Sequence, residues 1–265
     1  MSDLRYGCCV VKLGGSLITG FDANKPTIDR DLIVSRAREI AASGRHVVLV
    51  HGTGAFGKPP AIRYGYLGGS LCAEESGVVA MVAAELARFE FEVIECLCEV
   101  GLRLLRVPAL SLFRCDANGF VLTDASLIGD LLERGITPIV GGNFVVNDSG
   151  FAVCSSDIIA AELAIALNAS MLLLVTKEFG VYRDFGRSEA VFDILSAQDG
   201  AALNLIAGTV GDVSGGMRAK IDIGFRAVRH GIPTFVIDGR MDGNLSAALG
   251  GKPCRGTRLS CGESF

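Results

Sequence analysis

The chain has 265 residues, half of them hydrophobic, and a formal net charge of -4. This composition allows a large buried core in one domain or two lobes, and it provides no basic surface for nucleic acid or acidic membranes. Because no apolar run reaches the ~18 residues of a membrane span and the N-terminus MSDLRYG lacks the layout of a signal peptide, we expect a cytoplasmic protein.

The first predicted strand, over residues 8–13, runs directly into two adjacent glycines. Lys12 precedes Gly14 and Gly15, and Ser16 follows them. Glycine N–H groups can approach an anion without a Cβ in the way, and a lysine beside them adds a positive charge. The pattern is typical of a phosphate site. Without a P-loop consensus, an ordinary glycine turn next to a surface lysine is the alternative.

A polar loop is expected over 19–29, a helix over 30–43 ended by Gly44, and a second buried strand over 46–50. This strand also leads into a glycine-rich turn, HGTGAFGK, at 51–58. The carboxyl ends of parallel strands lie at one edge of a sheet, where ligands bind in open α/β folds. The two turns, each with one lysine, therefore indicate a shared phosphate site. The alternative is two unrelated loops.

The other predicted elements are a helix over 77–99, strands over 102–107 and 136–140 with a helix over 126–134 between them, a hairpin over 144–153, a helix over 158–167 with Ser156 as its N-cap, a strand over 171–176, a helix that follows the glycine pair at 215–216 and runs to about 230, and strands over 234–237 and 256–259. This alternation favours an α/β fold with a mainly parallel sheet and helices on both faces. The helix over 77–99 is apolar nearly all round. This favours burial on more than one side, either within the monomer or at a dimer interface.

The nine cysteines are an odd number, and most lie in apolar runs. Buried thiols fit this distribution better than a disulfide framework. Without paired C-x-x-C spacings or helical histidine clusters, we expect no metal bound directly by the protein.

Six motifs occur in an order and spacing similar to those of the amino acid kinase superfamily: VVKLGGSLIT at 10–19, HGTGAFG at 51–57, SSD at 155–157, VTKEFGVY at 175–182, DVSGGMRAK at 212–220 and RGTR at 255–258. Within that superfamily the chain most resembles isopentenyl phosphate kinases and the related fosfomycin kinases. The resemblance implies a three-layer αβα sandwich with a mainly parallel central sheet, forming a single amino acid kinase domain over 1–265. Residues 1–169 would form the acceptor-binding lobe, and residues 170–265 the nucleotide-binding lobe.

The resemblance also implies phosphoryl transfer from ATP, with Mg²⁺ carried by the nucleotide phosphates. Lys12 and Lys220 would hold the transferring group from opposite sides, and Asp157 would orient both lysines. The implied donors of N–H groups to the transition state are Gly14, Gly15 and Gly52. The implied nucleotide-binding residues are Lys12, Gly14, Ser16, Thr176, Gly180, Val181, Tyr182, Gly216, Met217 and Lys220. The implied acceptor-binding residues are Gly52, Gly54, Gly57, Lys58, Gly142 and Asn143.

Three departures from the family pattern bear on the substrates. Lys58 stands where phosphate-accepting relatives have histidine, and Asn143 stands where an aspartate is common. The usual T-D-V-D-G in the nucleotide lobe is T-K-E-F-G at 176–180. The S-S-D motif and Ala55 look more like fosfomycin kinases, whereas D-V-S-G-G-M looks more like isopentenyl phosphate kinases.

We therefore expect an ATP-dependent kinase, forming a homodimer, that phosphorylates the phosphate or phosphonate oxygen of a small molecule. Isopentenyl phosphate is the first candidate acceptor, and fosfomycin is the alternative. A degenerate member that binds nucleotide or oxyanion without turnover is the non-enzymatic alternative.

Overall fold

The computed structural model of the chain describes residues 7–183, 190–202 and 216–262. Its centre is an eight-stranded sheet in the order β13-β15-β14-β12-β1-β4-β9-β6. The strands are β13 (Ile194–Ser196), β15 (Gly256–Ser260), β14 (Thr234–Asp238), β12 (Met171–Thr176), β1 (Cys9–Leu13), β4 (Val47–His51), β9 (Thr137–Gly141) and β6 (Leu104–Arg106). The β14–β15 pair is antiparallel, and the other pairs are parallel.

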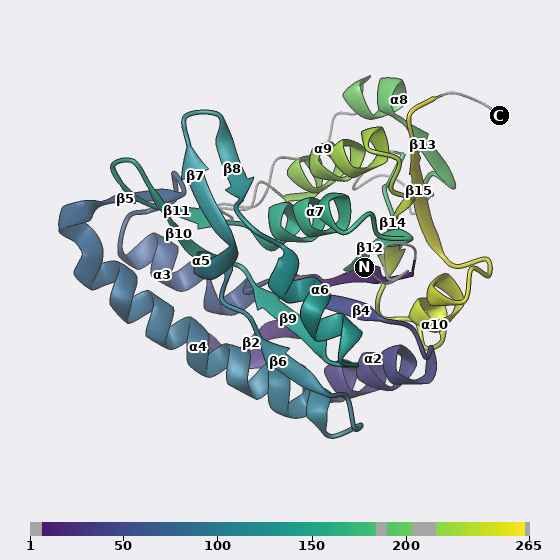
Figure 1. Ribbon diagram of the computed structural model, residues 1–265, viewed down its shortest axis with the longest axis horizontal. Helices are drawn as coiled ribbons and strands as arrows, with labels where there is room; N and C mark the ends of the chain where they lie inside the picture. Colours follow the sequence, from purple (N-terminus) through teal and green to yellow (C-terminus); the bar gives the residue numbers. More distant parts are fainter. Residues whose placement is uncertain (1–6, 184–189, 203–215, 263–265) are drawn as a thin grey trace.

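Helices cover both faces of this sheet, so the predicted three-layer α/β fold is confirmed (Figure 1). On one side lie α6 (Ser126–Glu133), α7 (Ser156–Ala166) and α9 (Gly216–Arg229); on the other lie α2 (Arg30–Ala42), α4 (Ser76–Cys98) and α10 (Asn244–Leu249), while α8 (Ala197–Ala202) follows β13. Successive residues of β1 contribute to different cores, Val10 to the α7 side and Val11 to the α2 side. This is the two-residue period of a strand buried on both faces.

Smaller elements surround the carboxyl edge of the sheet. They are α1 (Gly15–Ile18), the hairpin of β2 (Thr19–Asp22) and β3 (Lys25–Ile28), α3 (Lys58–Arg63), α5 (Ala109–Leu112), the hairpin of β7 (Phe113–Asp116) and β8 (Gly119–Leu122), and a three-stranded sheet of β10 (Asn143–Asn147), β11 (Gly150–Cys154) and β5 (Ser70–Cys72). A separate apolar cluster lies beneath them, with Tyr66, Val82 and Phe144 among its buried members.

One local prediction is wrong, and one short helix was not predicted. Residues 19–29 contain the β2–β3 hairpin rather than a loop, because Ala23 and Asn24 take left-handed φ values of 44° and 66° and reverse the chain. Most of the hairpin is exposed, so its sequence carries no alternating apolar pattern. Residues 58–63 form α3, which Pro59 and Pro60 permit because a helix tolerates proline in its first turn.

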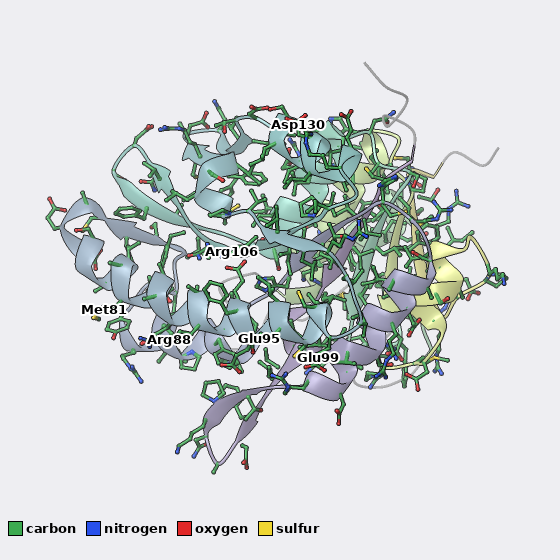
Figure 2. All side chains as sticks on the ribbon, turned by 60° about the horizontal axis from the view of Figure 1, so that its bottom comes forward. Met81, Arg88, Glu95, Glu99, Arg106 and Asp130 are labelled. Atoms are coloured by element: carbon green, nitrogen blue, oxygen red, sulfur yellow. The ribbon has the colours of Figure 1, made fainter. Side chains whose placement is uncertain are left out.

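The long helix α4 is present as predicted, but it is not buried on all sides. Val82 and Val93 are buried, whereas Met81 is 49% exposed and Phe91 is 59% exposed. Figure 2 shows Met81, Arg88, Glu95 and Glu99 along the outward side of the helix. The homodimer stays a prediction. In the described ranges, no helix combines the length and the apolar character that crossing a bilayer requires.

Candidate active site

A buried lysine lies near the carboxyl end of the central strand β1. Lys12 is 3% exposed, so the alternative of a surface lysine beside a glycine turn is wrong. Strand alternation directs its side chain to the same face as Val10, where α7 and α9 pack. There its Nζ lies 2.9 Å from Oδ1 of Asp157.

Asp157 is the second residue of α7, and Lys220 is in the second turn of α9. The N-cap of α7 is Ser155 rather than the predicted Ser156, since the Ser155 side chain accepts the Ile158 N–H at 3.3 Å. This cap places Asp157 in the first helical turn, facing β1. Lys220 Nζ donates to the same Asp157 Oδ1 at 2.7 Å, so one carboxylate oxygen joins both lysines.

Burial controls the electrostatics of this cluster, since Asp157 is 2% and Lys220 is 9% exposed. Desolvation, reinforced by the charge of Lys220, lowers the pKa of Lys12 to about 8. Burial alone would raise the pKa of Asp157, but the two lysines outweigh it and hold that pKa well below its usual range. Across the described ranges, no second carboxylate forms an ion pair with either lysine. Two ammonium groups share one carboxylate, so the cluster has one excess positive charge that an incoming anion can neutralise.

The two glycine turns at the ends of β1 and β4 are in direct backbone contact, as predicted from the shared edge. A Cβ on Gly15 would lie 2.2 Å from the Gly54 nitrogen, and one on Gly52 would lie 2.5 Å from the Gly15 nitrogen. The Gly52 position would also approach Ser156 Oγ at 3.2 Å. No side chain fits at these contacts. The glycines are therefore needed here to let the turns touch.

The predicted N–H donors are only partly available. Gly14 N–H donates to Val175 O at 2.8 Å, and Gly52 N–H donates to Leu13 O at 2.9 Å. The hydrogen bonds of the sheet thus continue past the strand ends, and the prediction that these two N–H groups face a phosphoryl group is wrong. Gly15 is the first residue of α1, where N–H groups have no partner within a helix.

Gly142 and Asn143, two predicted acceptor residues, also form hydrogen bonds of their own. Gly142 N–H donates to His51 O at 3.1 Å, and Asn143 Oδ1 accepts the Phe144 N–H at 2.8 Å. Gly142 lies near the start of α7, because a Cβ there would be 3.2 Å from the Ser156 nitrogen. This region therefore adjoins the helix that carries Asp157.

The other acceptor candidates lie between the β4 turn and α3. Gly54 begins a 3₁₀ turn over 54–56, and Gly57 N–H donates to Gly54 O at 3.2 Å. Lys58 is the first residue of α3. It borders a cavity of about 460 Å³ between α3 and the β2–β3 hairpin, which is also lined by Phe21, Asn24, Pro59, Ile62 and Arg63.

The predicted nucleotide residues of the β12 loop differ in exposure. Thr176 is buried, and its hydroxyl accepts the Glu178 N–H at 3.1 Å. Val181 is fully buried in the core and presents no side chain to an open site. Gly180 is buried beside it, whereas Tyr182 is half-buried and donates its hydroxyl proton to Glu178 at 3.1 Å.

The remaining nucleotide candidates are close to Lys12 or Lys220 in the sequence. Ser16 is exposed in the first turn of α1. Gly216 and Met217 open α9, one turn before Lys220, and Met217 packs against the core on that side. Residues 212–215 of the same motif lie outside the described residues.

Sequence reasoning missed a buried polar network behind the β4 turn. His51 Nε2 lies 3.3 Å from Oε1 of Glu90 on α4, and Arg106 Nε donates to the other oxygen of Glu90. Burial would raise the pKa of Glu90, but its bonds to His51 and Arg106 lower it overall. Gly141 makes room for the pair, since a Cβ there would lie 2.6 Å from His51 Nε2. The available signal was a glutamate flanked by two phenylalanines in an apolar helix.

Residues 7–183, 190–202 and 216–262 contain no group of three His, Cys, Asp or Glu side chains arranged to hold a metal ion.

Comparison with known proteins gives a consistent result. The model of the amino acid kinase family matches residues 7–238. The isopentenyl phosphate kinase of Methanothermobacter thermautotrophicus is 30% identical over 95% of this chain and 98% of its own length. That of Methanocaldococcus jannaschii is 29% identical over 96% of this chain and 99% of its own length.

Among solved structures, one described as an X-ray structure of isopentenyl phosphate kinase has a TM-score of 0.81 at 26% identity, covering 96% of this chain and 100% of the other.

Proposed function

The chain belongs to the amino acid kinase family, and from this premise we propose that it transfers the γ-phosphoryl group of ATP to isopentenyl phosphate, giving isopentenyl diphosphate. The observation that carries the proposal is the buried cluster of Lys12, Asp157 and Lys220. Its excess positive charge lies beside the contacting glycine turns, where a phosphoryl group in transit would be stabilised.

The residues of the cluster suit phosphoryl transfer because the protein's main tasks are to align donor and acceptor and to neutralise charge. Lys12 extends from the sheet and Lys220 from α9, so the two ammonium groups approach the site from different elements. Asp157 holds both at hydrogen-bond distance. The acceptor is already an anionic oxygen, and the reaction therefore needs no general base.

The site fits a nucleotide, since the buried ammonium groups of Lys12 and Lys220 can neutralise its phosphates. The amino acid kinase family generally uses ATP and Mg²⁺. Mg²⁺ prefers phosphate oxygens and water to a dedicated protein cage, in keeping with the donor set present here. Bound to the nucleotide, Mg²⁺ would neutralise part of the phosphate charge.

Isopentenyl phosphate is favoured as acceptor by two kinds of support. The two curated relatives described above are isopentenyl phosphate kinases that match almost end to end. In addition, the cavity that Lys58 borders is lined by the apolar side chains of Phe21, Pro59 and Ile62. Apolar surroundings suit a prenyl tail better than a small polar epoxide.

The first prediction is that ADP forms rapidly only when isopentenyl phosphate is supplied with ATP and Mg²⁺. Coupled assays on the purified full chain would compare isopentenyl phosphate with fosfomycin, glutamate and N-acetylglutamate, and mass spectrometry would identify the product. Lys12→Ala protein, purified in the same way, controls for contaminating kinases. Faster turnover of fosfomycin than of isopentenyl phosphate would make fosfomycin the acceptor instead. Nucleotide binding without turnover of any acceptor would favour the non-catalytic alternative.

The second prediction concerns Lys58, which we propose binds the phosphate of the acceptor. The second and third positions of α3 are prolines, so Lys58 is the only one of its first three residues with an N–H, and the Ala61 N–H donates to Gly57 O at 3.3 Å. An anion at this helix start depends mainly on the lysine side chain. Lys58→Ala should raise the acceptor KM at least ~10-fold, equivalent to ~1.4 kcal/mol, without changing the KM for ATP.

Two further variants sharpen this test. Lys58→His should restore acceptor binding near pH 6 and lose it above pH 7, because the reference pKa of histidine is about 6.5. Arg63→Ala is the matched control, since Arg63 borders the same cavity from the other end of α3. An equal KM increase in Arg63→Ala would indicate that any positive charge beside the cavity favours acceptor binding, with no specific role for Lys58. An unchanged KM in both Lys58 variants would remove Lys58 from the acceptor site.

A further inference from the structure

The loop that follows β12, residues 177–182, is attached to the sheet at both of its ends. At its start, Thr176 Oγ1 accepts the Glu178 N–H and donates to the Glu178 carbonyl, both at 3.1 Å. At its end, Val181 N–H donates to Thr257 Oγ1 of β15 at 2.8 Å. The middle of the loop, at Phe179, is held by side chains alone.

Two arginine side chains lie over the Phe179 ring. The guanidinium carbon of Arg255 is 4.1 Å from the ring centroid, and that of Arg240 is 4.6 Å from it. Both distances are within the range of cation–π attraction. Phe179, Arg240 and Arg255 together are called the two-arginine stack below.

Arg240 is fixed in this position from two directions. Its guanidinium forms two hydrogen bonds with the buried carboxylate of Asp238, at 3.0 and 3.1 Å. Its neighbours in the chain are held by the fully buried Arg36 of α2, which donates to Gly239 O at 2.8 Å and to Met241 O at 2.7 Å. The position of Arg240 is therefore tied to α2.

Arg255 is fixed through its backbone. Asn244 Oδ1 accepts the Arg255 N–H at 2.7 Å, and Asn244 Nδ2 donates to the Arg255 carbonyl at 2.9 Å. Unlike Arg240, Arg255 has no carboxylate partner among the residues that the structure describes. The ring of Phe179 is thus the contact that orients its guanidinium group.

We infer that the two-arginine stack is a positioning device that holds the β12 loop in the conformation that binds the nucleotide. Along the carboxyl edge of the sheet, this loop lies between the turn after β1 and the turn after β14. The stack braces the loop on the β14 side, away from Lys12. The inference rests on the proposed use of a nucleotide, and it adds Phe179, Arg240 and Arg255 as positioning residues for that site.

The test is nucleotide affinity measured by calorimetry with ADP on the full chain. Phe179→Leu keeps the apolar volume and removes the aromatic face, and Arg255→Met removes an exposed cation. Each should raise the Kd for ADP about 10-fold, equivalent to about 1.4 kcal/mol. The double variant should lose much less than the sum of the two, because both act through one contact. Phe179→Tyr should bind ADP as wild type does.

Two controls separate a loss of loop positioning from the general effects of removing a positive charge or disturbing the protein. Arg258→Met removes an exposed cation from β15, three residues after Arg255, and should leave ADP affinity unchanged. The acceptor KM should stay at the wild-type value in Phe179→Leu, since the stack lies away from the acceptor turns. Wild-type ADP affinity in Phe179→Leu, or an equal loss in Arg258→Met, would overturn the inference.

The outcomes also separate this inference from the proposed function. If the wild type binds ADP but transfers no phosphoryl group, the function is contradicted, and the Phe179 and Arg255 affinities still decide the inference. If the wild type binds no nucleotide, both are overturned. If Phe179→Leu does not fold, the surface variant Arg255→Met and its Arg258→Met control decide.

Discussion

Replacing Lys12 or Lys220 with alanine should lower kcat by ~10² or more and change KM only modestly. Each ammonium group is buried and fixed on Asp157, so its charge is in place before the reaction begins. It therefore acts mainly where negative charge moves in the transition state. Removing one lysine leaves the other paired with Asp157, and we expect the fold to survive.

Steady-state kinetics with saturating isopentenyl phosphate and ATP would measure this loss. Lys252→Ala, which removes an exposed lysine, is the control and should retain wild-type kcat. A normal kcat in either Lys12→Ala or Lys220→Ala would contradict the assignment of the site.

The prediction for Lys12 includes a pH dependence. The folded-state pKa of Lys12 lies below the usual value for lysine, at about 8, so Lys12 is charged at neutral pH and becomes neutral as pH rises past 8. The kcat/KM of the wild type should therefore fall above pH 8 as the free enzyme loses this charge. The fall in kcat should occur at higher pH, because bound phosphates favour the charged ammonium.

Asp157→Asn is expected to have the second large effect, on both turnover and stability. The variant leaves two buried ammonium groups without their shared anion. Removing one partner of a buried ion pair costs ~3 kcal/mol or more of unfolding free energy. We expect kcat to fall by ~10² or more, since neither lysine is then held in place. The stability loss should shrink at higher pH, where the lysines can lose their protons.

The competing explanation is that Asp157 only favours the positive end of α7, which is worth ~0.3–1 kcal/mol and no activity. Asp31→Asn is the matched control, because Asp31 occupies the first turn of α2 but is exposed. Urea unfolding and kcat measured on both variants separate the two explanations. A small, equal stability loss in both, with turnover intact in Asp157→Asn, would decide for the competing one.

Strand order explains why part of the site was predictable. Lys12 lies near the carboxyl end of a buried strand, and Gly15 and Gly52 follow buried strands. Because parallel strands share one carboxyl edge, the sequence alone predicts that these residues lie close together. The same rule could not show that Gly14 and Gly52 donate their N–H groups within the sheet. That outcome depends on how far the hydrogen bonds between strands continue past β1 and β4.

Other features depend on contacts between distant segments and have no local pattern. His51 meets Glu90 only because α4 packs across this part of the sheet, and Arg106 joins them from the edge strand β6, which is separated from β4 by β9. Phe179 meets Arg255 only because β15 runs antiparallel to β14 and begins beside the β12 loop. Neither pairing follows from spacing or composition.

The chain order of Lys12, Asp157 and Lys220 has a consequence for biosynthesis. Lys12 lies in the first strand, whereas Lys220 belongs to a helix near the far end of the chain, and Asp157 comes from between them. Contacts between such distant segments form late, because the chain must first close long loops. A nascent chain emerging from the ribosome cannot complete the cluster until α9 has been synthesised. Under the proposed function, an incomplete chain that lacks α9 also lacks Lys220, and its phosphoryl transfer should be correspondingly slower.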